Sequence, residues 1–303
     1  MDNIYILMIV ALALLAIADL VVGVSNDAVN FLNSAIGSKA VPFKTIMIVA
    51  SLGVAFGALS SSGMMEVARK GIFMPSEFYF NEIMIIFMAV MITDILLLDF
   101  FNTLGMPTST TVSIVFELLG AAVVMSLIKI SASEAETISN LGQYINTAKA
   151  TEIILGILLS VVVAFSVGAF VQYSTRLLLT FNFEEKAKWV AALFGGIAAT
   201  AITYFILIKG LKGASFISGD FKSYIYENTF TIVFISFIFW TTLCALITGL
   251  FKMSVYKFII IIGTFAIAMA FAGNDLVNFI GVPIAAWQSY EAWVVSGVPA
   301  ADF

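Results

Sequence analysis

The chain has 303 residues, of which 61% are hydrophobic and only 11% are charged, and its formal net charge is −5. A soluble domain carries about 25% charged residues, so this composition excludes a soluble globular fold, and the small number of Lys and Arg residues, 14, excludes nucleic acid as a partner. The absence of histidine and the single cysteine exclude a disulfide framework and remove the commonest zinc ligand, and we expect no cofactor.

Eight apolar runs follow one another along the chain, each close to the length of about 20 residues that a helix needs to cross a bilayer. They cover residues 4–24, 43–62, 83–101, 108–130, 153–171, 190–208, 229–250 and 256–272. Because the runs are continuously apolar rather than alternating, they indicate helices and not a barrel. We therefore predict an all-α, polytopic transmembrane helical bundle, a multi-pass protein of the cell membrane in contact with lipid.

A six-residue polar motif follows the first apolar run and recurs after the eighth. Residues 26–31 read Asn-Asp-Ala-Val-Asn-Phe, and residues 274–279 read Asn-Asp-Leu-Val-Asn-Phe. If each run crosses once, the first and eighth cross in opposite directions, and a motif repeated on antiparallel helices indicates an inverted-topology repeat. We expect broken helices at both copies, facing each other near the bilayer midplane. Ordinary helix caps are the alternative, and the third and fourth runs, joined by residues 102–107, could instead form a re-entrant hairpin.

Asn and Asp at the first, second and fifth positions of each motif offer oxygen atoms within about one helical turn. Hard cations such as sodium prefer a shell of oxygen ligands, and a bound cation would neutralise carboxylates that are costly in hydrocarbon. The motifs therefore predict a set of sodium ligands: Asn26, Asp27, Asn30, Asn274, Asp275 and Asn278.

A hydroxyl cluster opens the fourth run, where residues 105–111 read Gly-Met-Pro-Thr-Ser-Thr-Thr. Hydroxyls, free backbone N–H groups and the positive end of the helix dipole together make an anion site without Lys or Arg, although an ordinary Ser/Thr cap is the alternative. An ionised Asp can only accept hydrogen bonds, so an Asp that faces the anion favours one that keeps an O–H group. Phosphate keeps one at neutral pH and sulfate does not, which favours phosphate.

Four further acids lie within the apolar runs: Asp19, Asp94, Asp99 and Glu117. Charged residues inside spans are usually functional or paired. Asp94 and Asp99 could lie near the end of the third run, where water solvates them. Glu117 lies two turns into the fourth run, and we leave two roles open for it, binding of a coupling ion or proton and an interhelical hydrogen bond.

On these residues the chain resembles the inorganic phosphate transporter (Pit) family. The resemblance rests on Gly23–Lys39, Glu66–Gly71, Gly105–Thr111 and Gly273–Asn278, with the two Asn-Asp motifs as its most specific part. It implies phosphate uptake coupled to sodium or protons, an inverted-repeat fold and a homodimer. It also implies that the matching positions bind phosphate and sodium: Asp27, Asn30, Ser109, Thr110, Thr111, Asp275 and Asn278.

The chain departs from the family pattern in one respect. The family has a second Pro-x-Ser-x-Thr hairpin after the second Asn-Asp motif, and residues 279–303 contain none. We therefore expect the amino-terminal portion of a longer protein. Its predicted organisation is a first repeat at 1–130, a polar loop at 131–152, further membrane helices at 153–254 and the start of a second repeat at 255–303.

Together these features predict a secondary active transporter, a symporter of inorganic phosphate whose coupling ion is sodium or a proton. Because histidine is absent, proton coupling would have to use carboxylates or the substrate itself. A sulfate permease of the same fold, a channel for anions or cations, and an inactive fragment of the transporter remain alternatives. An enzyme is not expected, since no nucleophile with a nearby base appears in the sequence.

Overall fold

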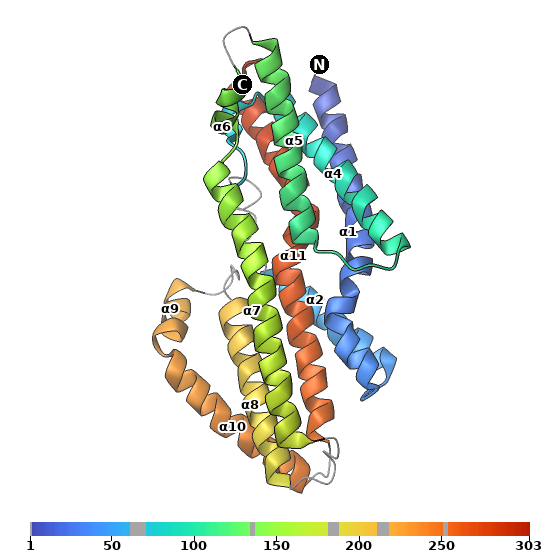
Figure 1. Cartoon of the computed structure of the whole chain (residues 1–303), viewed down its shortest axis with the longest axis vertical. Helices are drawn as coiled ribbons and strands as arrows, with labels where there is room; N and C mark the ends of the chain where they lie inside the picture. The colour runs from blue at the N-terminus through green and yellow to red at the C-terminus, as the bar shows by residue number, and fades with distance from the viewer. Residues whose placement is uncertain (1, 61–70, 134–136, 181–187, 211–217, 251–253) are drawn as a thin grey trace. The chain divides into compact units, whose positions relative to one another are not determined.

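The computed structural model describes residues 2–60, 71–133, 137–180, 188–210, 218–250 and 254–303, so most of the Glu66–Gly71 stretch lies outside the described residues. Over these ranges the chain is helical, without a named strand. The α-helices are α1 (Asp2–Ser38), α2 (Phe43–Ser60), α4 (Phe80–Thr103), α5 (Thr110–Ala132), α6 (Leu141–Tyr144), α7 (Thr147–Leu179), α8 (Lys188–Phe205), α9 (Gly219–Glu227), α10 (Thr229–Gly249) and α11 (Val255–Ser296) (Figure 1). Short 3-10 turns at Pro75–Glu77 and Ile138–Asn140 precede α4 and α6, and a π-helical turn at Ile206–Gly210 extends α8.

Each of the eight apolar runs forms a helix, which confirms the all-α transmembrane bundle. Among the described residues, seven helices are long and apolar enough to cross a membrane, and α2 is a shorter apolar helix. The prediction of broken helices at the Asn-Asp motifs was wrong, because α1 and α11 continue through them over 37 and 42 residues. Neither motif contains proline or glycine, so no residue in it removes a backbone donor or favours unwinding. Four of the polar side chains, those of Asn26, Asp27, Asp275 and Asn278, find partners on neighbouring segments instead.

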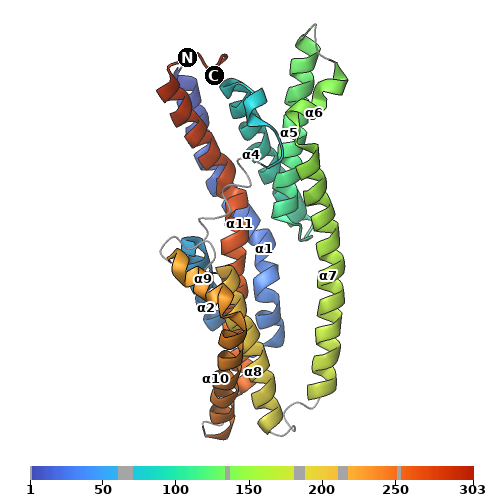
Figure 2. The same cartoon turned by 90° about the vertical axis from the view of Figure 1, so that its left-hand side faces the viewer.

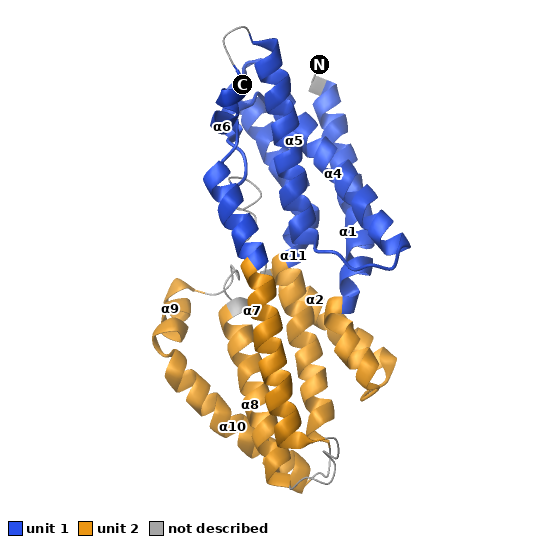
Figure 3. Ribbon diagram, in the orientation of Figure 1, with its two compact units in different colours: residues 1–29, 64–158, 275–303 blue, residues 30–63, 159–274 orange. Residues whose placement is uncertain are grey.

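The described residues divide into two compact units (Figure 3). Unit 1 comprises residues 1–29, 64–158 and 275–303, and so contains the first part of α1, the hairpin of α4 and α5, and the last part of α11. Figure 2 shows α1 and α11 side by side here. Tyr5, near the start of α1, packs on Trp293, near the end of α11, with ring centroids 5.1 Å apart. Gly23 lies so close to Phe279 that a Cβ atom would overlap the ring, so the two helices run antiparallel in this unit.

Unit 2 comprises residues 30–63 and 159–274, and so contains α2, α8, α10 and the first part of α11. Close approach of helices through small residues organises it, as is common between helices in lipid. Gly196 of α8 lies against Thr241 of α10, and Gly53 and Gly57 of α2 lie against the backbone of α11. Larger side chains at these positions would separate the helices.

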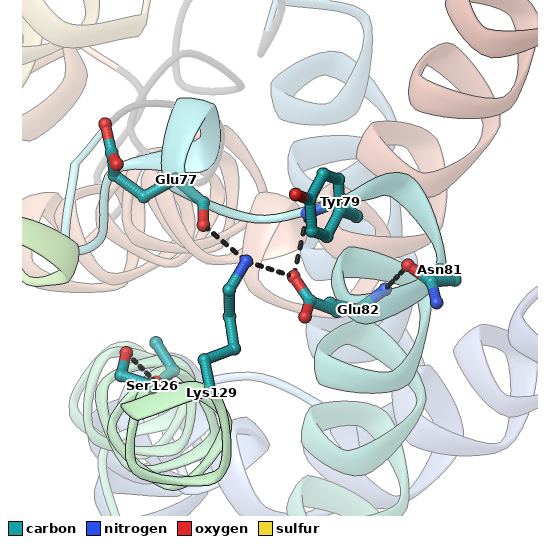
Figure 4. Close-up of polar contacts among 7 residues, drawn as sticks. Glu77, Tyr79, Asn81, Glu82, Ser126 and Lys129 are labelled. Atoms are coloured by element: carbon teal, nitrogen blue, oxygen red, sulfur yellow. Dashed lines mark hydrogen bonds and ion pairs between the residues drawn. The ribbon is translucent and has the colours of Figure 1, made fainter. Parts of the chain in front are cut away.

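Lys129, near the end of α5, holds that helix to the start of α4 (Figure 4). Its Nζ atom lies 2.8 Å from the Glu82 carboxylate, donates to the Glu77 carbonyl at 2.9 Å, and lies 4.3 Å from the centre of the Tyr79 ring. The Glu82 carboxylate also accepts from the Tyr79 amide at 2.8 Å, which caps α4. The Lys129 ammonium group therefore interacts with a carboxylate, a backbone carbonyl and an aromatic ring at the beginning of α4.

We expect Lys129→Met to lower the free energy of unfolding by about 1–3 kcal/mol, because the Lys129 and Glu82 side chains are only 19% and 16% exposed and solvent screens the pair little. Methionine keeps most of the apolar part of the lysine side chain, so the decrease in the free energy of unfolding measures the contribution of the charge. The matched control is Lys149→Met, whose pair with Glu152 is 40% and 69% exposed and should contribute less than about 0.5 kcal/mol. Thermal unfolding in detergent micelles measures both, and equal effects would contradict the prediction.

Candidate functional site

The connection between α4 and α5 is fastened to α1 by Asn26. The Asn26 side-chain amide donates to the Asn102 side-chain oxygen at 2.8 Å and to the Met106 carbonyl at 3.2 Å, and its oxygen accepts from the Thr108 amide at 2.8 Å. Asn102 in turn donates to the Val22 carbonyl at 2.9 Å. Asn26 is 5% exposed, and both of its amide hydrogens are engaged. Its observed contacts therefore position the connection that carries the hydroxyl cluster.

The hydroxyl cluster forms the start of α5. Ser109 is the N-cap residue, and its hydroxyl accepts from the Val112 amide at 3.3 Å. Thr110 and Thr111 occupy the first two helical positions, where backbone N–H groups lack partners within the helix. The hydroxyl cluster therefore forms a capped helix N-terminus, and anion binding at this terminus stays a prediction.

The two Asn-Asp motifs converge on this first turn of α5. The Thr110 hydroxyl donates to the Asp27 carboxylate at 3.2 Å, and the Thr111 hydroxyl donates to the Asp275 carboxylate at 3.0 Å. The Asn278 amide lies 3.2 Å from the Thr110 hydroxyl oxygen, 3.0 Å from that of Thr111 and 3.4 Å from the Asp275 carboxylate. We call these five residues the Asp-Thr cluster. All of them belong to unit 1, and Asp27 and Asn278 are buried.

The other two motif positions lie in unit 2. Asn30 and Asn274 have exposed side chains there, whereas Asn26 of unit 1 is engaged with the α4–α5 connection. The predicted set of sodium ligands is therefore divided between the units, and the Asp-Thr cluster contains three of its members, Asp27, Asp275 and Asn278.

The Asp-Thr cluster contains two carboxylates, and the charge of Asp275 acts on Asp27. Neither ion pair identified in the described ranges involves them, since those pairs join Lys129 with Glu82 and Lys149 with Glu152. An anion that approaches this cluster would therefore meet hydroxyls whose protons already point at negatively charged acceptors.

A family model described as the phosphate transporter family matches residues 23–301, which include both Asn-Asp motifs and the hydroxyl cluster. The chain belongs to the phosphate transporter family. The family is one of transporters, and the seven candidate spans among the described residues identify this member as a multi-pass membrane protein.

Several proteins similar to this family member are known. A protein of Pyrococcus furiosus, named as a candidate phosphate permease, is 27% identical over 277 residues, which are 90% of this chain and 64% of the relative. One of Thermococcus kodakarensis with the same description is 26% identical over 284 residues, covering 90% of this chain and 65% of the relative. The chain thus spans somewhat less than two thirds of these relatives. A solved structure described as "The sodium-dependent phosphate transporter" matches 96% of this chain and 69% of its own with a TM-score of 0.72 and 18% identity, and shows the same fold.

Proposed function

We propose that this family member is a symporter that moves inorganic phosphate together with a cation, sodium or a proton, and that the Asp-Thr cluster is the substrate site. The observation that carries the proposal is the convergence of one Asp from each motif on two adjacent threonine hydroxyls. Such a site offers ligands for both partners, since carboxylates bind cations while hydroxyls and helix-terminal N–H groups bind anions.

The hydrogen bonds of the cluster support an order of binding in which the cation comes first. The hydroxyls of Thr110 and Thr111 each have one proton, and both protons are directed at carboxylates. A cation that binds the oxygens of Asp27 and Asp275 competes for these acceptors and neutralises their charge. The hydroxyls can then turn toward an anion, and Ser109 at the helix cap completes the phosphate contacts.

The proposed sodium ligands remain Asn26, Asp27, Asn30, Asn274, Asp275 and Asn278. Within this set we assign the charge-bearing role to Asp27 and Asp275, because they alone can neutralise a cation, and we expect Asn26 to act mainly by positioning the α4–α5 connection. The structural neighbour is described as sodium-dependent, which supports sodium as the coupling ion.

Phosphate fits the Asp-Thr cluster better than sulfate because it can donate a hydrogen bond to a carboxylate. A bound cation partly neutralises the carboxylates of Asp27 and Asp275, but their oxygens still need hydrogen-bond donors. The O–H group of hydrogen phosphate supplies one such donor. Sulfate has none at neutral pH, so it would leave a buried acceptor without a partner.

We propose alternating access as the transport cycle, with rocking of one repeat against the other. The antiparallel contacts of α1 and α11 support an inverted repeat. In the proposed organisation the first repeat covers 1–130 and the second repeat starts within 255–303. The loop at 131–152 and the membrane helices at 153–254 lie between them in the sequence. A homodimer is proposed on the resemblance to the Pit family.

The test is uptake of labelled phosphate into liposomes that contain the purified protein. We expect saturable, uphill accumulation when a sodium gradient or a proton gradient is imposed, and none without a gradient. Unlabelled sulfate should compete at least about 100-fold more weakly than unlabelled phosphate. Flux that never exceeds equilibrium would indicate a channel, and equal competition by sulfate would indicate a sulfate permease.

A further inference from the structure

A second group of carboxyls lies in unit 1, apart from the Asp-Thr cluster. It consists of Asp19 of α1, Asp94 of α4 and Glu117 of α5, and Asp94 is within hydrogen-bonding reach of both others. Asp19 precedes Asp27 by eight residues in the same helix, which corresponds to about 12 Å along the axis. We call these three residues the carboxyl triad.

The triad lies against the packed core of unit 1, with two of its carboxyls fully buried and Glu117 half-buried. Asp19 and Asp94 are 0% exposed, so the expectation that Asp94 lies near water at the end of its run was wrong, whereas Asp99 is exposed as expected. Asp94 lies one turn beyond Val90, and Glu117 adjoins Leu118, both of which belong to the apolar core. The buried face of α4 therefore continues past Asp94 to Leu98, whereas Asp99 lies on an exposed face of the same helix.

All six oxygens of the triad are buried and lack a donor among the described residues. The electrostatic partners of the triad carboxyls are one another and, for Asp94, Asp27, and no Lys or Arg of the described ranges is among them. Asp27 and Asp275 differ, because threonine hydroxyls satisfy their carboxylates. A buried acceptor without a donor is destabilising, so the triad needs a ligand that supplies donors or positive charge.

A proton meets this need better than a metal ion. A proton on one carboxyl gives an O–H group that donates to the next carboxyl, which satisfies two groups at once and removes one negative charge from the membrane interior. The described residues contain no group of three acidic, His or Cys side chains arranged to hold a metal ion. The triad geometry therefore fits protons shared between neighbouring oxygens.

The other charged residues on the described α-helices of unit 1 are Asp2 and Asp27 on α1, Glu82 and Asp99 on α4, Lys129 on α5, Lys149 and Glu152 on α7, and Asp275 and Glu291 on α11. Lys129 and Glu82 neutralise each other. Asp27 of the Asp-Thr cluster interacts electrostatically with Asp94 of the carboxyl triad. A proton gained or lost at the triad therefore changes the electrostatic field at the Asp-Thr cluster.

A route for the proton is suggested by a mostly apolar cavity of about 700 Å³ between α4 and α5. Glu117 lines it, together with Thr93, Thr108 and Ser113. Thr108 belongs to the hydroxyl cluster and Ser113 lies one turn before Glu117, so hydroxyl-bearing residues between the hydroxyl cluster and Glu117 line the cavity.

We propose that Asp19, Asp94 and Glu117 form a proton-binding site, distinct from the Asp-Thr cluster, whose protonation is coupled to phosphate movement. The coupling to phosphate movement rests on the proposed function, whereas proton binding at the triad does not. In each cycle one proton from water on one side adds to a triad carboxylate, and the same proton leaves to water on the other side, which restores the original charge. Loading the triad makes the field at Asp27 less negative and so favours the anion.

The first test is infrared spectroscopy of the protein purified in detergent. We expect an absorption from a protonated carboxyl at neutral pH that shifts in D₂O, is lost or altered in Asp94→Asn and Glu117→Gln, and is unchanged in the control Asp99→Asn, whose carboxylate is exposed on the same helix as Asp94. Absence of the absorption from the wild type, or its removal by sodium ions at constant pH, would overturn the proton site.

The second test separates the triad from the substrate site. In liposomes, Glu117→Gln should reduce phosphate accumulation driven by a pH gradient by about tenfold or more, while exchange of internal for external phosphate stays near the wild-type rate. Accumulation that is unchanged in Glu117→Gln overturns the coupling. A wild-type protein that neither accumulates nor exchanges phosphate overturns the proposed function, and the infrared result then still decides whether the triad binds protons.

Discussion

Asp27→Asn and Asp275→Asn are each expected to reduce coupled phosphate uptake by roughly 100-fold or more, which corresponds to about 2.7 kcal/mol. Asparagine has nearly the same shape as aspartate and its oxygen can still accept from Thr110 or Thr111, so the fold of the Asp-Thr cluster is preserved. The charge is lost, however, and with it the attraction for the coupling cation. If the cation must release the hydroxyls before phosphate binds, both substrates fail to load.

Initial rates of labelled phosphate uptake into liposomes measure this effect, with the concentration of the coupling ion varied for each protein. Ser25→Ala is the matched control, because Ser25 is an exposed neighbour of Asp27 whose hydroxyl bonds only locally to the Val21 carbonyl. We expect wild-type rates for Ser25→Ala and unchanged thermal unfolding for all three variants. Uptake within about threefold of wild type in both Asp variants would show that the Asp-Thr cluster is not the site of coupling.

The helices were predictable from the sequence because lipid leaves few alternatives to a long apolar run. The ends of α1 and α11 were not predictable in the same way. The expected breaks were placed at Asn-Asp motifs because polar residues in a span need partners, and unwound backbone is one way to supply them. The structure supplies them through Asn102, the Met106 carbonyl and the threonine hydroxyls instead, so the backbone keeps its helical hydrogen bonds.

The composition of the Asp-Thr cluster could be predicted, since Asp27, Asp275 and Asn278 belong to a repeated motif and the threonines to a recognisable helix start. The partners of Asn26 were missed, although Asn102 at the end of an apolar run was a visible signal. The carboxyl triad could be predicted only as separate acids. Whether Asp19, Asp94 and Glu117 meet depends on how far three helices are rotated and shifted, and packing rather than local sequence decides that.

The contact of α2 with α11 in unit 2 depends on two glycines four residues apart, Gly53 and Gly57. This spacing places both on one face of α2, a pattern that lets helix backbones approach closely in lipid. A Cβ atom at Gly53 would lie 2.5 Å from the Phe265 carbonyl oxygen, and one at Gly57 would overlap the Met269 carbonyl oxygen. The obstacle is backbone, so no rotation of a side chain on α11 can relieve it.

Gly57→Ala is therefore expected to lower the free energy of unfolding by about 2–3 kcal/mol, because the two helices must separate to admit one methyl group. The control is Gly120→Ala on α5, where nothing lies within 4 Å of the added Cβ and alanine should be neutral or stabilising by about 0.5–1 kcal/mol. Thermal unfolding in detergent measures both. Adding Ala272→Gly removes the side-chain contact at 2.9 Å but leaves the backbone contact, so the double variant should regain only part of the loss. Full recovery, or a Gly57→Ala protein as stable as Gly120→Ala, would show that side-chain packing and not backbone contact sets the distance between α2 and α11.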